Sequence, residues 1–343
     1  MCGIFAYAGT ENAVPLLIDG LRSVEYRGYD SAGVALLKND GTLTRIRRTG
    51  KVQELADAVA EGEALGTTGI AHTRWATHGK PIEKNAHPHI ANHTVGVVHN
   101  GIIENYLELK DSQLKQGYSF TSDTDTEVIA HAIEFAMQSS DSFLESVQKA
   151  ITTFDGAYGL GIISPNYPNT IIATRKGSPL VIGIAKNGNY IASDQLALLP
   201  VTNKFIFLEE GDIAELNLEK ITIYDQNGNK VNRPIKTSKI KEGRVNLGNY
   251  KHFMQKEIFE QPQSIRDTLE SRITKDNVVV SAFGHKAKEV FNKISGEDLE
   301  NLETFSARSL KVMPLSLPKL YTFPLFPLII MTSIQAAKSA PYI

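Results

Sequence analysis

Apolar positions recur with two different spacings along the first 154 residues. Short apolar runs typical of strands occupy residues 4–8, 34–37, 43–47, 68–72 and 94–98. Apolar residues at helical spacing occupy residues 14–21, 52–60 and 124–137. Thr10 is expected to cap the first helix, and Asn39-Asp40-Gly41 is a hairpin signal between two of the strands. Strands and helices therefore interleave in this part of the chain.

Beyond Phe154 the pattern is that of consecutive short strands separated by Pro, Gly and Asn turns. The expected strands are residues 158–163, 170–174, 181–184, 190–192, 204–207, 213–216 and 221–224. Elements that are partly interleaved and partly segregated predict an α+β layered domain rather than a doubly wound parallel sheet.

The pattern weakens towards the end of the chain. Residues 226–250 are expected to form a polar linker, followed by helical material that starts near residue 252 and extends to about residue 294. The last forty residues, 304–343, contain no Asp, Glu or Gly and hold five of the fourteen prolines. Folded surfaces normally carry charges of both signs, so this tail does not resemble the end of a native domain. The expected division is residues 1–240, 241–303 and 304–343.

Composition narrows the function classes. The chain has 343 residues, of which 42% are hydrophobic and 22% charged, with a net charge of −2. These values are typical of globular proteins, and the nearly balanced charge does not point to nucleic acid or an anionic membrane as a partner. A single cysteine excludes an internal disulfide and fits a cytoplasmic protein. The apolar stretch between Lys319 and Lys338 is broken by Pro324 and Pro327, and its apolar core is shorter than the roughly 20 residues of a membrane span.

Cys2 is the first candidate for chemistry. Most lone cysteines are small buried hydrophobic residues. Removal of Met1, however, would leave a thiol and an α-amine on one residue, and the reference pKa of that amine is about 8. A neutral amine can accept the thiol proton, which is the arrangement of an N-terminal nucleophile. Both interpretations of Cys2 remain open at this point.

Two loops carry further polar groups. Arg74 offers a guanidinium suited to binding a carboxylate, either of a substrate or of a structural partner. Trp75, the only tryptophan, is expected in a lid or at a partner contact. Asn100 and Gly101 are a donor pair of the oxyanion-hole type, although Asn-Gly is also a common turn.

Residues 122–127 precede the helix expected at 124–137. Asp123 or Thr124 is expected to cap that helix, with Glu127 completing a capping box. A capping role leaves Asp125 unexplained, and its carboxylate suits an ammonium group. The six histidines between residues 72 and 99 lack metal-binding spacings, so no metal or other cofactor is expected.

These motifs together resemble the class II glutamine amidotransferases. The residues that carry the resemblance are Met1-Cys-Gly-Ile4, Glu25-Tyr-Arg-Gly-Tyr-Asp-Ser-Ala-Gly33, His72-Thr-Arg-Trp-Ala-Thr-His-Gly79, Asn85-Ala-His-Pro-His89, His99-Asn-Gly-Ile-Ile-Glu-Asn105 and Asp123-Thr-Asp-Thr-Glu127. Within the family, they are most similar to the branch that transfers nitrogen to fructose 6-phosphate, and the likeness spans about 300 of the 343 residues. The phosphoribosylpyrophosphate amidotransferases share Cys-Gly-Ile but differ at residues 26–30 and 74–78.

The resemblance implies a four-layer αββα N-terminal-nucleophile domain that hydrolyses glutamine to glutamate and ammonia. In that case Cys2 attacks the side-chain amide and forms a thioester, with its own α-amine as the base. Asn100 and the Gly101 N–H would hold the oxyanion. Arg74 would bind the α-carboxylate of glutamine and Asp125 its α-ammonium.

The resemblance also implies roles for four residues around this centre. Thr77 and His78 would line the glutamine pocket, Trp75 would lie on a flap that gates ammonia, and Arg27 would lie near the nucleophile. The implied partners are L-glutamine and fructose 6-phosphate. The family forms homodimers in the cytoplasm, with no nucleic-acid or membrane partner.

The sugar-binding half of the family is where the sequence departs from the resemblance. That half is an α/β sugar-isomerase unit with Gly-rich phosphate loops, and only its start is expected, within residues 241–303. No Gly occurs after Gly296. A glutaminase half without a sugar site is therefore expected. The alternatives are a non-catalytic glutamine-binding module and a non-functional truncated fragment.

Overall fold

The computed structural model describes residues 2–25, 30–38, 40–62, 65–75, 79–238, 249–251, 255–256 and 258–262. The chain divides into two compact units, Met1–Asn246 and Leu247–Ile343. Three predicted site residues, Arg27, Thr77 and His78, lie outside the described residues. The tail at 304–343 and all of the helical material expected after residue 262 also lie outside them.

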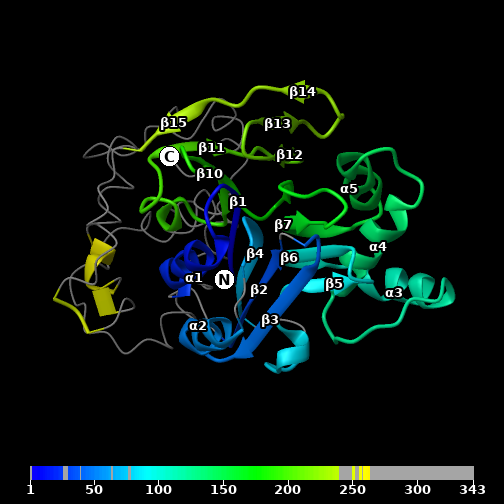
Figure 1. Ribbon diagram of the computed structural model, residues 1–343, viewed down its shortest axis with the longest axis horizontal. Helices are drawn as coiled ribbons and strands as arrows, with labels where there is room; N and C mark the ends of the chain where they lie inside the picture. Colours follow the sequence, from blue (N-terminus) through cyan, green and yellow to red (C-terminus); the bar gives the residue numbers. More distant parts are fainter. Residues whose placement is uncertain are drawn as a thin grey trace, which may run out of the picture. The chain divides into compact units, whose positions relative to one another are not determined.

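Two antiparallel sheets form the centre of the first unit (Figure 1). In the described part of the chain the first sheet has eight strands, in the order β15 (Ile235–Thr237), β11 (Lys204–Phe207), β9 (Val181–Ile184), β10 (Gly188–Ala192), β1 (Gly3–Gly9), β4 (Thr68–Arg74), β2 (Ser31–Leu37) and β3 (Leu43–Thr49). The described strands of the second sheet are, in order, β14 (Lys230–Val231), β13 (Ile221–Tyr224), β12 (Ile213–Leu216), β8 (Ile171–Lys176), β7 (Gly156–Ile163), β6 (Val95–Ile103) and β5 (His89–Ala91).

Helices cover the outer faces of both sheets. The first sheet is covered by α1 (Ala13–Val24) and α2 (Val52–Glu61). On the side of the second sheet lie α3 (Tyr106–Lys115), α4 (Glu127–Met137) and α5 (Phe143–Ile151) (Figure 1). Two short 3₁₀ turns, Glu83–Asn85 and Gln195–Ala197, lie in loops. The layers run helix, sheet, sheet, helix, so the expected α+β four-layer αββα fold is confirmed.

Three clusters of apolar side chains lie between the four layers of helices and sheets, and β1 contributes to two of these clusters. Phe5 and Tyr7 pack against the helices on the first sheet, whereas Ile4, Ala6 and Ala8 pack between the two sheets. Neighbouring side chains of a strand point to opposite faces, so a strand covered on both faces is apolar at every position. This burial explains why the strands were visible as continuous apolar runs.

Helix starts differ from the sequence prediction. Asn12, not Thr10, caps α1, and its side-chain oxygen accepts the N–H of Val14 at 3.3 Å. The strong helix starts at Glu127 rather than residue 124, and its N-cap residue Thr126 makes no side-chain capping hydrogen bond. The expected capping box is therefore wrong.

Two helices were not predicted. α3 buries only the polar Gln113 among its residues, so it has no apolar stripe to reveal it. α5 does carry a signal, because Ser142 precedes it and accepts the N–H of Glu145 at 3.1 Å. A Ser-x-x-Glu spacing before a short amphipathic segment is the recognised start of a helix.

The linker expected at residues 226–250 is partly wrong, because β14 and β15 lie within it and pair with β13 and β11. Arg233 explains why this segment is held. Its guanidinium donates two hydrogen bonds to Asp212, at 2.9 and 2.7 Å, and lies 2.8 Å from Glu209. The Asp212 side chain is fully buried. A bidentate pair of this kind fixes the segment after β14 to the turn before β12.

We expect Arg233→Ala to lower the free energy of unfolding by about 3 kcal/mol, because it leaves the buried Asp212 carboxylate without its partner. The matched control is Arg22→Ala, which breaks an exposed ion pair with Asp19 worth about 0–1 kcal/mol. Urea unfolding of both variants measures the difference. Equal losses in the two variants would contradict this account.

Candidate active site

Cys2 lies immediately before β1, at the centre of the first sheet. Its Sγ accepts the N–H of Trp75 at 3.1 Å, and its carbonyl accepts the side-chain N–H of Asn100 at 3.0 Å. Burial raises the pKa of the Cys2 thiol above its ordinary value, and this outweighs the opposing effect of the Trp75 N–H. A thiol of this kind needs a base to become a nucleophile.

A cavity of about 250 Å³ opens beside Cys2. It is lined by residues from widely separated parts of the sequence, namely Cys2, Arg74, Trp75, His87, His99, Asn100, Gly101, Ile102, Thr124, Asp125, Thr126, Ser178, Pro179 and Ser193. Six residues singled out from the sequence therefore meet at one cavity: Cys2, Arg74, Trp75, Asn100, Gly101 and Asp125. The chemical roles assigned to them remain predictions.

The pair Asn100 and Gly101 lies inside strand β6, opposite Gly159 and Tyr158 of β7. The alternative that this pair forms a turn is therefore wrong. Gly101 has a φ of +136°, and a Cβ at this position would lie 1.9 Å from the carbonyl oxygen of Ala157. Only glycine fits such a position.

Arg74 is buried at the end of β4. Its guanidinium lies 3.7 Å from Asp30 and donates to the carbonyls of Gly79 and Lys80 at 3.2 and 3.3 Å. The structural carboxylate that the sequence left open is thus present. The same guanidinium lines the cavity, and its five N–H donors can serve more than one partner.

Asp125 is the acidic residue that lines the cavity. Its Oδ2 accepts the N–H of Ile103 at 2.8 Å and lies 3.9 Å from Nδ1 of His99. The carboxylate is buried and borders the cavity. One anion and one cation, Asp125 and Arg74, therefore line the same small space as the thiol.

The residues next to Asp125 are held by buried hydrogen bonds. Thr124 lies 3.1 Å from Nε2 of His89, and Thr126 lies 3.0 Å from Nδ1 of His99. The carboxylate of Glu127 accepts the N–H groups of residues 121 and 122. Buried hydrogen bonds of this kind restrict the side chains on either side of Asp125. This network also explains why the helix begins only at Glu127.

Four histidines, His72, His87, His89 and His99, are buried, and two of them, His87 and His99, line the cavity. Burial lowers the pKa of His72 to about 3 and holds the pKa values of His87 and His89 well below their usual range. Among the described residues, no group of three or more His, Cys, Asp or Glu side chains is arranged to hold a metal ion. The histidines are instead hydrogen-bonded or stacked on one another.

Sequence reasoning missed Ser178, Pro179 and Ser193 as lining residues. Ser193 accepts the N–H of Ile4 at 3.0 Å through its hydroxyl, which anchors the start of β1 next to the thiol. Ser178 and Pro179 follow β8 in a turn without any chemical signal. Their place at the cavity follows from the sheet topology, which no local pattern reports.

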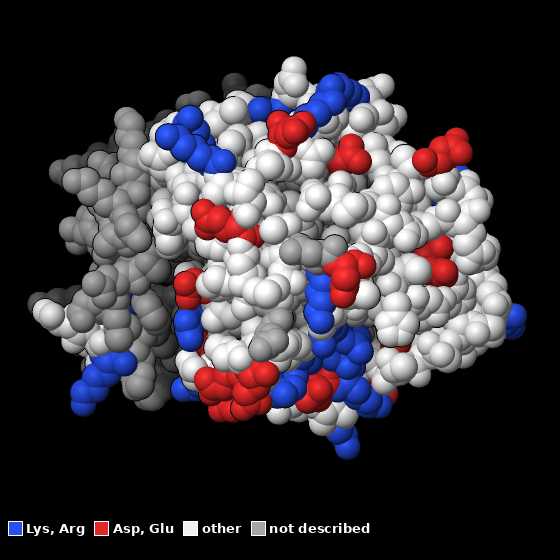
Figure 2. Space-filling model, in the orientation of Figure 1, with Lys and Arg blue, Asp and Glu red and all other residues white. Residues whose placement is uncertain are grey.

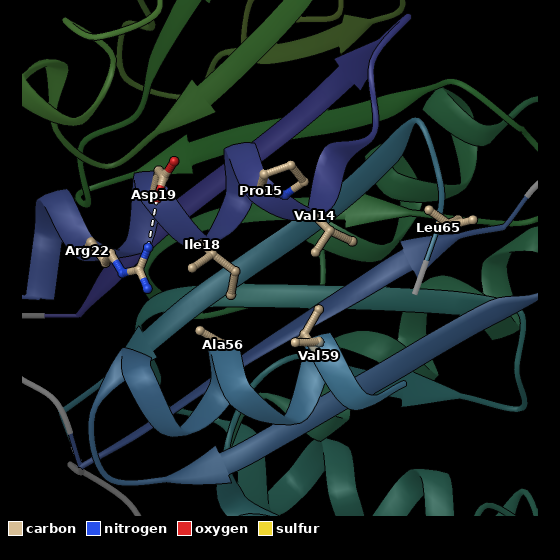
Figure 3. A pocket seen from close by; sticks show the side chains of 9 residues that line it. Val14, Pro15, Ile18, Asp19, Arg22, Ala56, Val59 and Leu65 are labelled. Atoms are coloured by element: carbon tan, nitrogen blue, oxygen red, sulfur yellow. Dashed lines mark hydrogen bonds and ion pairs between the residues drawn. The ribbon is translucent and has the colours of Figure 1, made fainter. Parts of the chain in front are cut away.

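A larger cavity, of about 770 Å³, lies between α1 and α2 (Figure 3). Its walls are apolar, with Val14, Ile18 and Val59 among them, and the Asp19–Arg22 ion pair lies at one end. None of the predicted site residues that the structure describes lines it. Chemistry rather than size therefore identifies the smaller cavity as the candidate active site.

Acidic and basic side chains are interspersed on the face drawn in Figure 2. The described part of that face therefore shows no large patch of one charge sign that would attract a partner of the opposite sign. Within the described residues, no helix has the length and apolar character needed to cross a membrane.

Comparison with known proteins connects this site to a family. A glutamine amidotransferase domain model matches residues 72–200. Proteins from Vibrio vulnificus (strain CMCP6) and Haemophilus influenzae, both named glutamine–fructose-6-phosphate aminotransferase (isomerizing), are each 51% identical over 294 residues, covering 86% of this chain and 48% of their own. The solved glutamine phosphoribosylpyrophosphate amidotransferase of B. subtilis matches with a TM-score of 0.58 and 25% identity, over 67% of this chain and 50% of that chain.

The fold and the matched residues define a glutamine amidotransferase domain of the N-terminal-nucleophile type, and the chain is similar to the class II family of these enzymes. Within that family its curated relatives are the glutamine–fructose-6-phosphate aminotransferases, as the sequence motifs predicted. The chain spans about half the length of these relatives.

Proposed function

We propose that the first unit of this chain hydrolyses L-glutamine to glutamate and ammonia through a thioester on Cys2. The observation that carries the proposal is the meeting of the Cys2 thiol with the Asn100 and Gly101 donors at one cavity, which Arg74 and Asp125 also line. The volume of about 250 Å³ suits a small amino acid.

The proposed reaction begins when removal of Met1 frees the α-amine of Cys2. This amine takes the thiol proton, directly or through a water, and the thiolate attacks the carbonyl carbon of the side-chain amide of glutamine. The carbon–nitrogen bond breaks, and the proton held by the amine passes to the leaving nitrogen, which departs as ammonia. Water then cleaves the thioester, releasing glutamate and restoring the thiol.

Donors beside the thiol stabilise the negative charge that develops on the amide oxygen. In the proposal these are the side-chain N–H of Asn100 and the backbone N–H of Gly101. The Asn100 amide already lies 3.0 Å from the Cys2 carbonyl, so it is held at the nucleophile. Donors that are fixed before the reaction need no reorganisation as the charge forms.

The two ends of the glutamine zwitterion are assigned to Arg74 and Asp125. Trp75, whose side chain is 58% exposed, is assigned to a flap over the thiol that gates ammonia. The resemblance alone supports the roles of Thr77 and His78 in the pocket and of Arg27 near the nucleophile. L-Glutamine is thus the proposed substrate of the first unit, and fructose 6-phosphate is a partner of the family.

We expect Arg74→Ala and Asp125→Asn to lower kcat/KM for glutamine about tenfold to a hundredfold, because each removes a charge-assisted contact worth about 1.5–3 kcal/mol. Asparagine keeps an acceptor for the Ile103 N–H, so folding is preserved. Asp30→Asn is the control for Arg74, since it removes the structural partner and leaves the guanidinium. A loss in Asp30→Asn equal to that in Arg74→Ala would show that Arg74 is only structural.

The proposed function is tested by incubating the purified chain with glutamine and fructose 6-phosphate and assaying glutamate and amino sugar separately. Because residues 297–343 contain no Gly, they supply no Gly-rich phosphate loop, and we expect glutamate without amino sugar. Formation of glucosamine 6-phosphate in proportion to glutamate would contradict that expectation. Absence of glutamate would contradict the proposed function itself.

A further inference from the structure

His72 is a buried residue of β4 whose ring reaches from the first sheet to the second. Its Nε2 lies 3.0 Å from the carbonyl oxygen of His99 and 3.0 Å from the side-chain oxygen of Asn100, both on β6. A carbonyl oxygen can only accept a hydrogen bond, so Nε2 carries the proton. The atom of Asn100 that faces Nε2 must therefore be its oxygen, which turns its NH₂ group towards Cys2.

We infer that His72 is a positioning residue for glutamine hydrolysis, because its Nε2–H fixes the Asn100 amide with the NH₂ group aimed at the nucleophile. The inference rests on the proposed function. An amide turned the other way would present its oxygen to the developing oxyanion and repel it. The backbone carbonyl of His99 determines the tautomer of His72, because a carbonyl oxygen needs a donor at Nε2. It thereby excludes the tautomer in which an unprotonated Nε2 would accept a hydrogen bond from the Asn100 NH₂.

The surroundings of His72 favour this single tautomer. Its ring stacks on that of His87, with centroids 4.1 Å apart and planes at 17°. Its Nδ1 is buried and has no hydrogen-bond partner among the described residues. A proton on Nδ1 would leave a buried donor unsatisfied and break both bonds made by Nε2, which is costly. Burial also keeps the ring neutral, because the pKa of His72 is lowered to about 3.

Two substitutions at His72 separate positioning from packing. Glutamine places its side-chain nitrogen the same number of bonds from Cα as Nε2 of histidine, whereas asparagine is one bond shorter. We expect His72→Asn to lower kcat about tenfold to a hundredfold, with little change in KM for glutamine, because the groups that bind the zwitterion are untouched. His72→Gln should recover most of the lost kcat. The rate of Cys2 alkylation by iodoacetamide should be the same in both variants.

Several outcomes would overturn the inference. Wild-type kcat in His72→Asn would show that no positioning is needed. An equal loss in both variants, with altered KM or altered alkylation, would show that His72 only supports the packing of the two sheets.

A spectrum of the chain labelled with ¹⁵N-histidine, with His72→Gln used to assign the signal, tests the same inference without any activity. The Nε2–H tautomer is expected whether or not the chain hydrolyses glutamine. The Nδ1–H tautomer would overturn the inference even in an active enzyme. A chain with the Nε2–H tautomer but no glutaminase activity would instead contradict the proposed function.

Discussion

Replacement of Cys2 by alanine is expected to abolish glutamate release, lowering kcat by about a thousandfold or more. The Sγ atom forms the thioester in the proposed reaction, and the chain contains no second cysteine that could replace it. Burial around the thiol, which raises its pKa, makes the adjacent amine essential as a base. Retention of Met1, or a tag placed before Cys2, should therefore cause a similar loss, because the amine is then part of a peptide bond.

The measurement combines a glutamate assay with the intact mass of each preparation, which reports whether Met1 is present. The control is the wild-type chain with Met1 removed, assayed at the same concentration. Full activity in a chain that retains Met1 would contradict the role of the amine. Full activity in Cys2→Ala would contradict the role of the thiol.

Gly101→Ala is expected to lower kcat by about a hundredfold or more. A Cβ at this position would lie 1.9 Å from the Ala157 carbonyl oxygen, so β6 has to move away from β7. That movement displaces the Gly101 N–H from the place where the oxyanion forms in the proposed reaction. The φ of +136° adds backbone strain for any residue with a Cβ.

Gly117→Ala is the matched control for Gly101→Ala. Gly117 also has a positive φ, +93°, but a Cβ there meets nothing within 4 Å, and the residue lies away from the cavity. This variant should cost about 1 kcal/mol of stability and leave kcat unchanged. Steady-state kinetics and urea unfolding of both variants separate the two effects. Wild-type kcat in a folded Gly101→Ala variant would exclude this N–H from the oxyanion site.

The sequence predicted the strands well because most of them are buried on two faces. The apolar run at residues 4–8 lies in β1, whose side chains pack against the helices on one face of the sheet and between the two sheets on the other. Helix α3 and strands β14 and β15 were missed for the opposite reason. They bury few apolar side chains and depend on tertiary contacts, such as the Arg233–Asp212 pair.

The candidate site was only partly visible in the sequence. Cys2, Arg74 and Asp125 stood out because their chemistry is unusual for their positions. Asn100 was ambiguous, because an Asn-Gly pair is a local turn signal, whereas its pairing with β7 depends on residues almost sixty positions away. His72 was noticed only as one of several histidines, since its partner on β6 is 28 residues away.

The central claim, that this chain hydrolyses glutamine at Cys2, is tested most directly with glutamine labelled with ¹⁵N in its side-chain amide. Purified chain with Met1 removed is incubated with this substrate, and glutamate and ¹⁵N-ammonium are measured over time, with Cys2→Ala as the blank. The account predicts glutamate and ¹⁵N-ammonium in a one-to-one ratio, with neither product above background in the blank. Equal product in the wild type and in Cys2→Ala would contradict the account, as would the absence of product from the wild type.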